Sequence, residues 1–161
     1  MIHARTKSVE ETRTLAAELA PLLQAGDLIL LAGNLGTGKT AFVQGLARGL
    51  GIVEPVVSPS FVLVRTYEGR LPLNHVDVYR LESMQELVDL GMAELLDEGG
   101  VTAIEWGDVV LPGLPAEYLE VRLEPGEADD DRELTLFTVG ASWGRRTGAI
   151  QRAVERWTVT P

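Results

Sequence analysis

The segment that most constrains this chain is Gly33-Asn-Leu-Gly-Thr-Gly-Lys-Thr40, which joins two stretches of different periodicity. Before it, residues 27–32 (DLILLA) form a short, continuously apolar run, typical of a strand covered on both faces of a sheet. After it, apolar residues recur at helical spacing from Lys39 to Leu50, and Gly51 follows as a stop signal. The order strand, glycine-rich loop, helix favours an α/β fold.

This loop matches the pattern GxxxxGK[ST], which binds phosphate when a strand precedes it and a helix follows. Its glycines let successive backbone N–H groups turn inward, and the helix start adds the positive end of its dipole. Lys39 can reach the β- and γ-phosphates, and the hydroxyl of Thr40 can bind Mg²⁺. The alternative, a structural turn with a solvated lysine, is disfavoured because the pattern would arise by chance in roughly two sequences per thousand. The predicted nucleotide-binding residues are Gly33, Asn34, Leu35, Gly36, Thr37, Gly38, Lys39 and Thr40.

The rest of the chain alternates between helical and extended patterns without a repeat or a linker. Ser8, with Glu11 three residues later, predicts the start of a helix that ends before Gly26. Strands are predicted at residues 61–67, 71–79, 101–105, 118–123 and 134–139, and helices at 83–91 and 142–157; the first two strands form a hairpin. We therefore expect one domain over residues 1–161, with a central, mostly parallel sheet, flanking helices and an added antiparallel part.

Hydrolysis of a nucleotide also needs a carboxylate that acts on the metal ion or its waters. Asp77 ends one predicted strand and Glu105 ends another, so both are candidates, although a solvated carboxylate at a strand exit is an equally ordinary finding. His75 has no second His or Cys nearby, which favours a core or supporting role over metal binding. Ser58-Pro59-Ser60 offers two hydroxyls that could sense a γ-phosphate, with a plain turn as the alternative.

Composition excludes several classes of protein. The chain has no cysteine, which removes disulfides, thiol catalysis and cysteine-ligated metals. Its formal net charge of −10 argues against a stand-alone nucleic-acid binder. No apolar run approaches the length of a membrane span, so we expect a cytoplasmic protein. No NKxD or LSGGQ-like motif is present, which disfavours GTPases and transporters.

Taken together, the segments GNLGTGKTAFVQGLARGLG, VSPSF, NHVDVYRL, Leu90-Gly91 and AIEWGD resemble in order and spacing the TsaE family of bacterial ATPases, also called the YjeE family. The resemblance covers roughly residues 8 to 139. It implies a P-loop ATPase that uses ATP and Mg²⁺ and is required for making threonylcarbamoyladenosine in tRNA. In that family, TsaD transfers the threonylcarbamoyl group, and TsaE binds the TsaB–TsaD complex and hydrolyses ATP.

The resemblance also implies roles for individual residues. Asp77 corresponds to the metal-linked acid of the family's HxDxYR motif, and Glu105 to the acid of its IEW motif. Lys39, Asp77 and Glu105 are thus the expected catalytic residues, and Thr40, Asp77 and Glu105 the expected metal ligands. The resemblance also offers further candidates, from the family's motifs and from the segment expected near adenine (residues 8–12). They are Thr12, Ser60, Arg80 and Trp106. Ser60 stands where the family usually has Thr, and Gly107 where it usually has Pro.

Three hypotheses remain open: an ATPase that depends on protein partners, a small-molecule kinase, and an ATP-gated binding module without hydrolysis. The charge distribution bears on the first of them. Residues 81–131 hold 1 basic and 15 acidic side chains, whereas residues 1–80 hold 8 basic and 7 acidic ones. Such an acidic segment would repel tRNA and could meet a basic protein partner, so we expect no direct tRNA binding by this chain alone.

Overall fold

The computed structural model describes residues 1–34, 36–59, 64–78, 85–86, 89, 91–106 and 115–160. The strands are β1 (Ile2–Thr6), β2 (Leu28–Ala32), β3 (Val64–Tyr67), β4 (Leu73–Asp77), β5 (Val101–Trp106), β6 (Tyr118–Pro125) and β7 (Arg132–Val139). The helices are α1 (Val9–Leu19), α2 (Lys39–Gly49), α4 (Met92–Asp97), α5 (Ala141–Gly144) and α6 (Thr147–Ala153), with 3₁₀ turns at Ala20–Leu22 and Glu155–Trp157.

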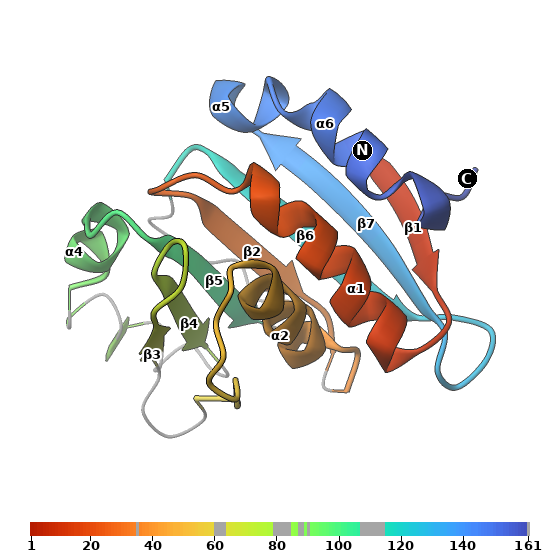
Figure 1. The fold of residues 1–161 in the computed structure, drawn as a ribbon, viewed down its shortest axis with the longest axis horizontal. Coiled ribbons are helices and arrows are strands. Elements are labelled where there is room, and N and C mark those ends of the chain that lie inside the picture. Colours follow the sequence, from red (N-terminus) through yellow and green to blue (C-terminus); the bar gives the residue numbers. More distant parts are fainter. Residues whose placement is uncertain are drawn as a thin grey trace.

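The seven strands form one sheet in the order β1-β7-β6-β2-β5-β4-β3 (Figure 1). At its centre, β2 pairs in parallel with β5 and β6, and β4 pairs in parallel with β5. Toward the edges the pairs β6–β7, β1–β7 and β3–β4 are antiparallel. The expected mostly parallel centre with an antiparallel part is confirmed, and it places the ends of β2, β4 and β5 at one edge of the sheet.

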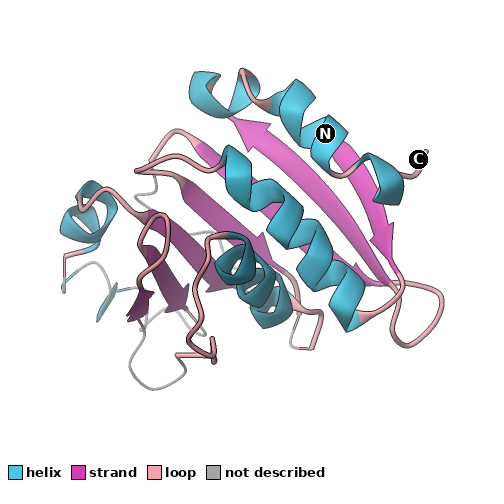
Figure 2. Cartoon of the chain, viewed as in Figure 1, coloured by secondary structure: helices cyan, strands magenta, loops and turns pink. Residues whose placement is uncertain are grey.

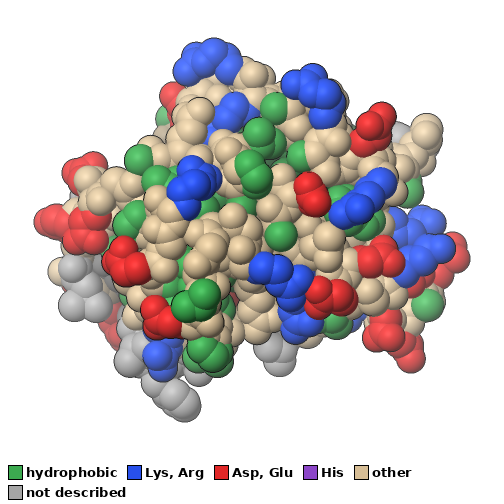
Figure 3. All heavy atoms as spheres, viewed as in Figure 1, with side chains coloured by type: hydrophobic (Ala, Val, Ile, Leu, Met, Phe, Trp, Pro, Cys, Tyr) green, Lys and Arg blue, Asp and Glu red, His purple; other side chains and the backbone are tan. Residues whose placement is uncertain are grey.

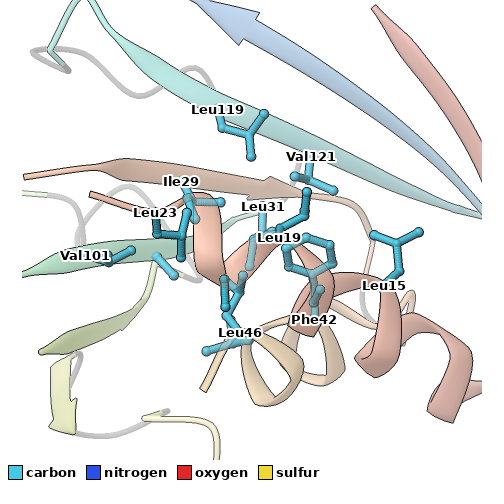
Figure 4. Close-up of a cluster of buried hydrophobic side chains, with 14 of the residues drawn as sticks. Leu15, Leu19, Leu23, Ile29, Leu31, Phe42, Leu46, Val101, Leu119 and Val121 are labelled. Carbon is cyan, nitrogen blue, oxygen red and sulfur yellow. The ribbon is translucent and has the colours of Figure 1, made fainter. Parts of the chain in front are cut away.

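Every residue of β2 is buried, as its apolar run predicts, because the two faces of the strand belong to different clusters. Ile29 and Leu31 belong to the larger cluster, on the face that α1 and α2 cover (Figure 2). Figure 4 shows that Leu31 lies close to Leu19 of α1 and Phe42 of α2. Leu28, Leu30 and Ala32 belong to a smaller cluster, which includes Val76 and Ile104 and against which α4 packs through Leu95 and Leu96.

Helix α2 packs closely against α1 through two glycines. A Cβ atom on Gly45 would lie 2.2 Å from the carbonyl oxygen of Arg13, and one on Gly49 would lie 2.4 Å from the Cβ atom of Ala20. Only glycine allows this approach of the two backbones. Because α2 begins at Lys39, the contact with α1 fixes the helix start that follows the glycine-rich loop.

The predicted start of α1 is confirmed, since the hydroxyl of Ser8 accepts a hydrogen bond from the backbone N–H of Glu11 at 3.0 Å. The helix ends at Leu19, followed by a 3₁₀ turn that contains Pro21.

The predicted hairpin is confirmed for the described residues by the antiparallel pairing of β3 with β4. Among the helices of the described segments, none combines the length and the apolar character needed to cross a bilayer.

Three features differ from the sequence-based expectations. Strand β1 was not predicted, because its alternation of buried and partly buried residues spans only five positions. The helix expected at 83–91 lies largely outside the described residues, whereas α4 begins directly after Gly91, which adopts a left-handed conformation with a φ of 98°. The single helix predicted for 142–157 is three short pieces, interrupted around Arg146, whose side chain turns inward to bind Asp27.

Candidate functional site

The glycine-rich loop lies at the carboxyl edge of the sheet, between β2 and α2 (Figure 1). Gly38 precedes α2 with a φ of 100°, and Gly36 has a φ of 82°, so both use conformations that favour glycine. At Gly33 a Cβ atom would lie 2.5 Å from Oγ1 of Thr37 and 2.6 Å from the carbonyl oxygen of Leu123. The three glycines therefore satisfy backbone requirements of the loop itself.

Lys39 lies folded over this loop. Its Nζ donates hydrogen bonds to the carbonyl oxygens of Gly33 and of Asn34, the latter at 3.3 Å. Thr37 closes the same turn, with its Oγ1 donating to the Asn34 carbonyl at 2.7 Å. The ammonium group is thus held directly above the glycine-rich backbone, where an anion bound by the loop would meet it.

Glu105, near the end of β5, is the most enclosed acidic side chain of the site, with 3% of its surface exposed. The hydroxyl of Thr40 lies 3.0 Å from each of its carboxylate oxygens. On its other side, Nε2 of the fully buried His75 contacts Oε2. The expected supporting role of His75 is consistent with this contact, while its Nδ1 has no hydrogen-bond partner among the described residues.

Asp77, the last residue of β4, pairs directly with Glu105 across the two parallel strands. Its Oδ2 accepts a hydrogen bond from the hydroxyl of Ser58 at 3.1 Å. Partial burial raises the pKa of Asp77, and the charge of Glu105 raises it further, against the smaller opposing effects of Ser58, His75 and Lys39. Asp77 and Glu105 are therefore neighbours on adjacent strands, and Glu105 contacts the hydroxyl of Thr40.

Replacing Asp77 with asparagine is expected to stabilise the ligand-free protein at pH 7, raising its Tm by about 2 °C. The pKa of Asp77 is higher in the folded protein than in the unfolded chain. The stability that the protonated carboxyl contributes is therefore fully present at pH values below the unfolded pKa. This stability is lost as the pH rises through the folded pKa. The Tm of Asp77→Asn should therefore come to exceed that of the parent as the pH is raised from about 3 to 7. Thermal unfolding measured across this range tests it.

The exposed Asp130 in the β6–β7 turn offers a matched control for that measurement, since it is also an aspartate but lies in a different part of the chain. Asp130→Asn should leave the pH dependence of Tm as in the parent. A Tm for Asp77→Asn below that of the parent at pH 7 would show that the carboxylate stabilises the fold.

These side chains fit a magnesium ion that arrives with a nucleotide. Mg²⁺ prefers oxygen ligands and is usually held by one or two carboxylates together with substrate phosphates. Thr40, Asp77 and Glu105 supply one hydroxyl and two carboxylates beside the loop. In the described part of the chain, no group of three or more His, Cys, Asp or Glu side chains could hold a metal ion by itself.

The other predicted residues have varied positions. Thr12 is buried, and its Oγ1 lies 2.7 Å from Oγ1 of Thr6, so adenine contacts from residues 8–12 stay a prediction. Trp106 is the last residue of β5 and pairs with Ala32. Leu35, Ser60, Arg80 and Gly107 lie outside the described residues.

Two features beside the loop were not anticipated. A cavity of about 320 Å³ adjoins it, lined on one side by Gly33, Asn34 and Thr37 and on the other by the end of β6. Arg132, at the start of β7, donates hydrogen bonds to the carbonyl oxygens of two loop residues. The only sign of Arg132 in the sequence is the change of charge after Asp131, which does not indicate a contact with a loop almost 100 residues earlier.

Comparison with known proteins identifies relatives of this chain. The family model described as "Threonylcarbamoyl adenosine biosynthesis protein TsaE" matches residues 6–134. A tRNA threonylcarbamoyladenosine biosynthesis protein TsaE from Bacillus subtilis is 42% identical over 137 residues, which is 84% of this chain and 85% of that protein. A protein of the same name from a Nostoc species is 47% identical over 135 residues, or 80% of this chain and 82% of its own length.

A solved structure extends the similarity to the fold. The crystal structure of Bacillus subtilis YdiB superposes with a TM-score of 0.80 at 35% sequence identity, covering 94% of this chain and 97% of that one. The matching regions include the glycine-rich loop, Asp77 and Glu105. The family model, the curated relatives and the shared fold together show that this chain belongs to the TsaE family.

Proposed function

We propose that this protein binds ATP with Mg²⁺ at the glycine-rich loop and hydrolyses the ATP in support of tRNA threonylcarbamoyladenosine biosynthesis. The observation that supports this most is the position of Glu105, whose buried carboxylate meets the hydroxyl of Thr40 directly behind the loop. A carboxylate and a hydroxyl so placed suit a nucleotide-bound magnesium ion. The TsaE names of the relatives support the assignment to this tRNA modification.

In the proposed mechanism the loop's backbone N–H groups and Lys39 hold the phosphates. Thr40, Asp77 and Glu105 hold the metal ion, directly or through water, and Glu105 also orients the attacking water. The chemistry that Mg²⁺ supplies when bound is neutralisation of the charge that develops on the phosphate oxygens. The described side chains mainly hold the phosphates and the metal ion in position. We therefore expect slow turnover by the chain alone and faster turnover once protein partners complete the site.

The partners we propose are TsaB and TsaD. Incubating the protein with γ-labelled ATP, alone and with TsaB plus TsaD, tests this together with the alternatives. Released phosphate that increases with the partners supports the proposal. Label transferred to a small acceptor would indicate a kinase instead, and ATP binding without turnover in either condition would indicate a binding module. Omitting Mg²⁺ should abolish turnover in both arms.

Charge supports a protein partner rather than direct contact with tRNA. In the view of Figure 3, acidic side chains gather over α4, and basic side chains lie over α5 and α6. Many of the 15 acidic residues of 81–131 belong to α4, β6 and the β6–β7 turn. In Figure 1, α4 and the β6–β7 turn lie at opposite ends of the molecule, so this negative charge is spread over two regions. Acidic regions are attracted to basic protein surfaces and repel a phosphate backbone.

We therefore expect the affinity for the TsaB–TsaD complex to fall by about tenfold between roughly 50 and 300 mM salt, because screening weakens the attraction between exposed charges. The isolated protein should show no tRNA binding in a filter or gel-shift assay at either salt concentration. Titrations with the partner complex over this salt range measure the first effect. A tight complex of this chain alone with tRNA would contradict the role proposed for the acidic regions.

A further inference from the structure

Arg132 connects the glycine-rich loop to the turn between β6 and β7. Its Nη2 and Nε donate to the carbonyl oxygens of Gly36 and Thr37, both at 3.2 Å. Its Nη1 donates to the carbonyl oxygens of Asp129 and Asp131, both at 2.7 Å. Four of the five N–H bonds of the guanidinium group are thus directed at backbone carbonyls.

The turn that binds Arg132 is itself closed by hydrogen bonds. Gly126 N–H donates to the Asp131 carbonyl at 2.9 Å, and Asp131 N–H donates to the Ala128 carbonyl at 3.0 Å. Asp131 also accepts, through Oδ2, a hydrogen bond from the backbone N–H of Ala128 at 3.3 Å. The shorter bonds of Arg132 are those to this turn, so the guanidinium is anchored there and extends from it to the loop.

Peptide geometry gives these contacts a consequence for the loop. In a trans peptide unit the C=O and the following N–H point in opposite directions. Holding the carbonyls of Gly36 and Thr37 toward Arg132 therefore turns the N–H groups of Thr37 and Gly38 away from it. The Thr37 N–H donates to the Asn34 carbonyl at 3.3 Å, whereas the Gly38 N–H has no such bond among the described residues. Inward-facing N–H groups are what a glycine-rich loop offers to a phosphate.

We propose that Arg132 is a positioning residue, which orients the peptide unit between Thr37 and Gly38, and with it the Gly38 N–H, for phosphate binding. It acts on the backbone and not on the phosphates. The inference rests on the proposed nucleotide site, because the loop's shape matters only if the loop binds phosphate. Arginine suits this task better than lysine, since its planar fork presents several N–H groups in fixed directions.

The test uses Arg132→Met, which keeps an unbranched, largely apolar side chain and removes the guanidinium donors, with Arg132→Lys as the conservative variant. Hydrogen–deuterium exchange in the nucleotide-free protein measures the loop directly. We expect Arg132→Met to speed exchange of the amides in residues 36–39 by about tenfold, and Arg132→Lys to have a smaller effect. Arg122→Ala is the control, since Arg122 lines the cavity beside the loop but bonds to Glu120.

Binding of fluorescent ADP and ATP analogues separates positioning from direct contact. A loop with misdirected N–H groups should bind ADP and ATP more weakly by the same factor, about tenfold, with turnover at saturating ATP within about threefold of the parent. Unchanged loop exchange in Arg132→Met would overturn the proposal, as would weakened binding of ATP with unchanged binding of ADP, which indicates direct contact with the γ-phosphate. If the parent binds neither nucleotide, the proposed function fails, while the exchange experiment still decides whether Arg132 holds the loop.

Discussion

Replacing Lys39 with alanine should reduce ATP turnover by about 1000-fold or more and weaken ATP binding markedly. The reason lies in where the ammonium group is held. Its bonds to the carbonyls of Gly33 and Asn34 keep it over the loop without a carboxylate partner among the described residues. Phosphate oxygens are stronger acceptors than these carbonyls, so the group can transfer to them over a short path.

Phosphate release from labelled ATP and binding of a fluorescent ATP analogue measure the two effects separately. Arg152→Ala is a control for the loss of one positive charge, because Arg152 is exposed on α6, far along the chain from the loop. Lys39→Arg should restore little, since a guanidinium does not fit where a compact ammonium lies between two loop carbonyls. Hydrolysis and binding by Lys39→Ala at parental levels would show that the nucleotide site lies elsewhere.

The parts of the fold that could be predicted are those determined by local pattern. The apolar run at β2, the Ser8 cap of α1 and the glycine stop after α2 each depend on residues close together in sequence. Strand β1 has too few apolar residues to stand out, and it becomes a strand by pairing with β7, more than 120 residues later. The terminal helix is interrupted for a similar reason, since Arg146 is drawn to Asp27.

The site shows the same division between local and distant signals. Asp77 and Glu105 could be identified as strand-end carboxylates, but their pairing depends on β4 and β5 being neighbours in exact register. That register also brings His75 beneath Glu105, a contact that no local pattern indicates. The bonds of Arg132 to the loop depend on the position of the β6–β7 turn and were likewise beyond prediction.

The pair Asp27–Arg146 gives the second large expected effect, on stability and not on activity. Asp27 lies just before β2, and its two carboxylate oxygens accept hydrogen bonds from Arg146 at 2.7 and 2.9 Å. Arg146 also donates to the Leu22 carbonyl at 3.1 Å and lies 3.8 Å from the ring centre of Trp143. Both charged side chains are buried, so the pair holds the C-terminal helices against the start of β2.

Replacing Asp27 with alanine should lower the free energy of unfolding by about 3–5 kcal/mol, because it leaves the guanidinium of Arg146 buried without its counter-charge. Urea unfolding followed by tryptophan fluorescence measures the change. The double variant Asp27→Leu with Arg146→Met should recover much of the loss, since replacing both charges removes the desolvation penalty along with the attraction. Glu10→Ala, which breaks the exposed pair with Arg48, should change the urea midpoint little, because water and salt screen that pair. If Asp27→Ala were as mild as Glu10→Ala, the buried pair would not be what attaches the C-terminal helices to the sheet.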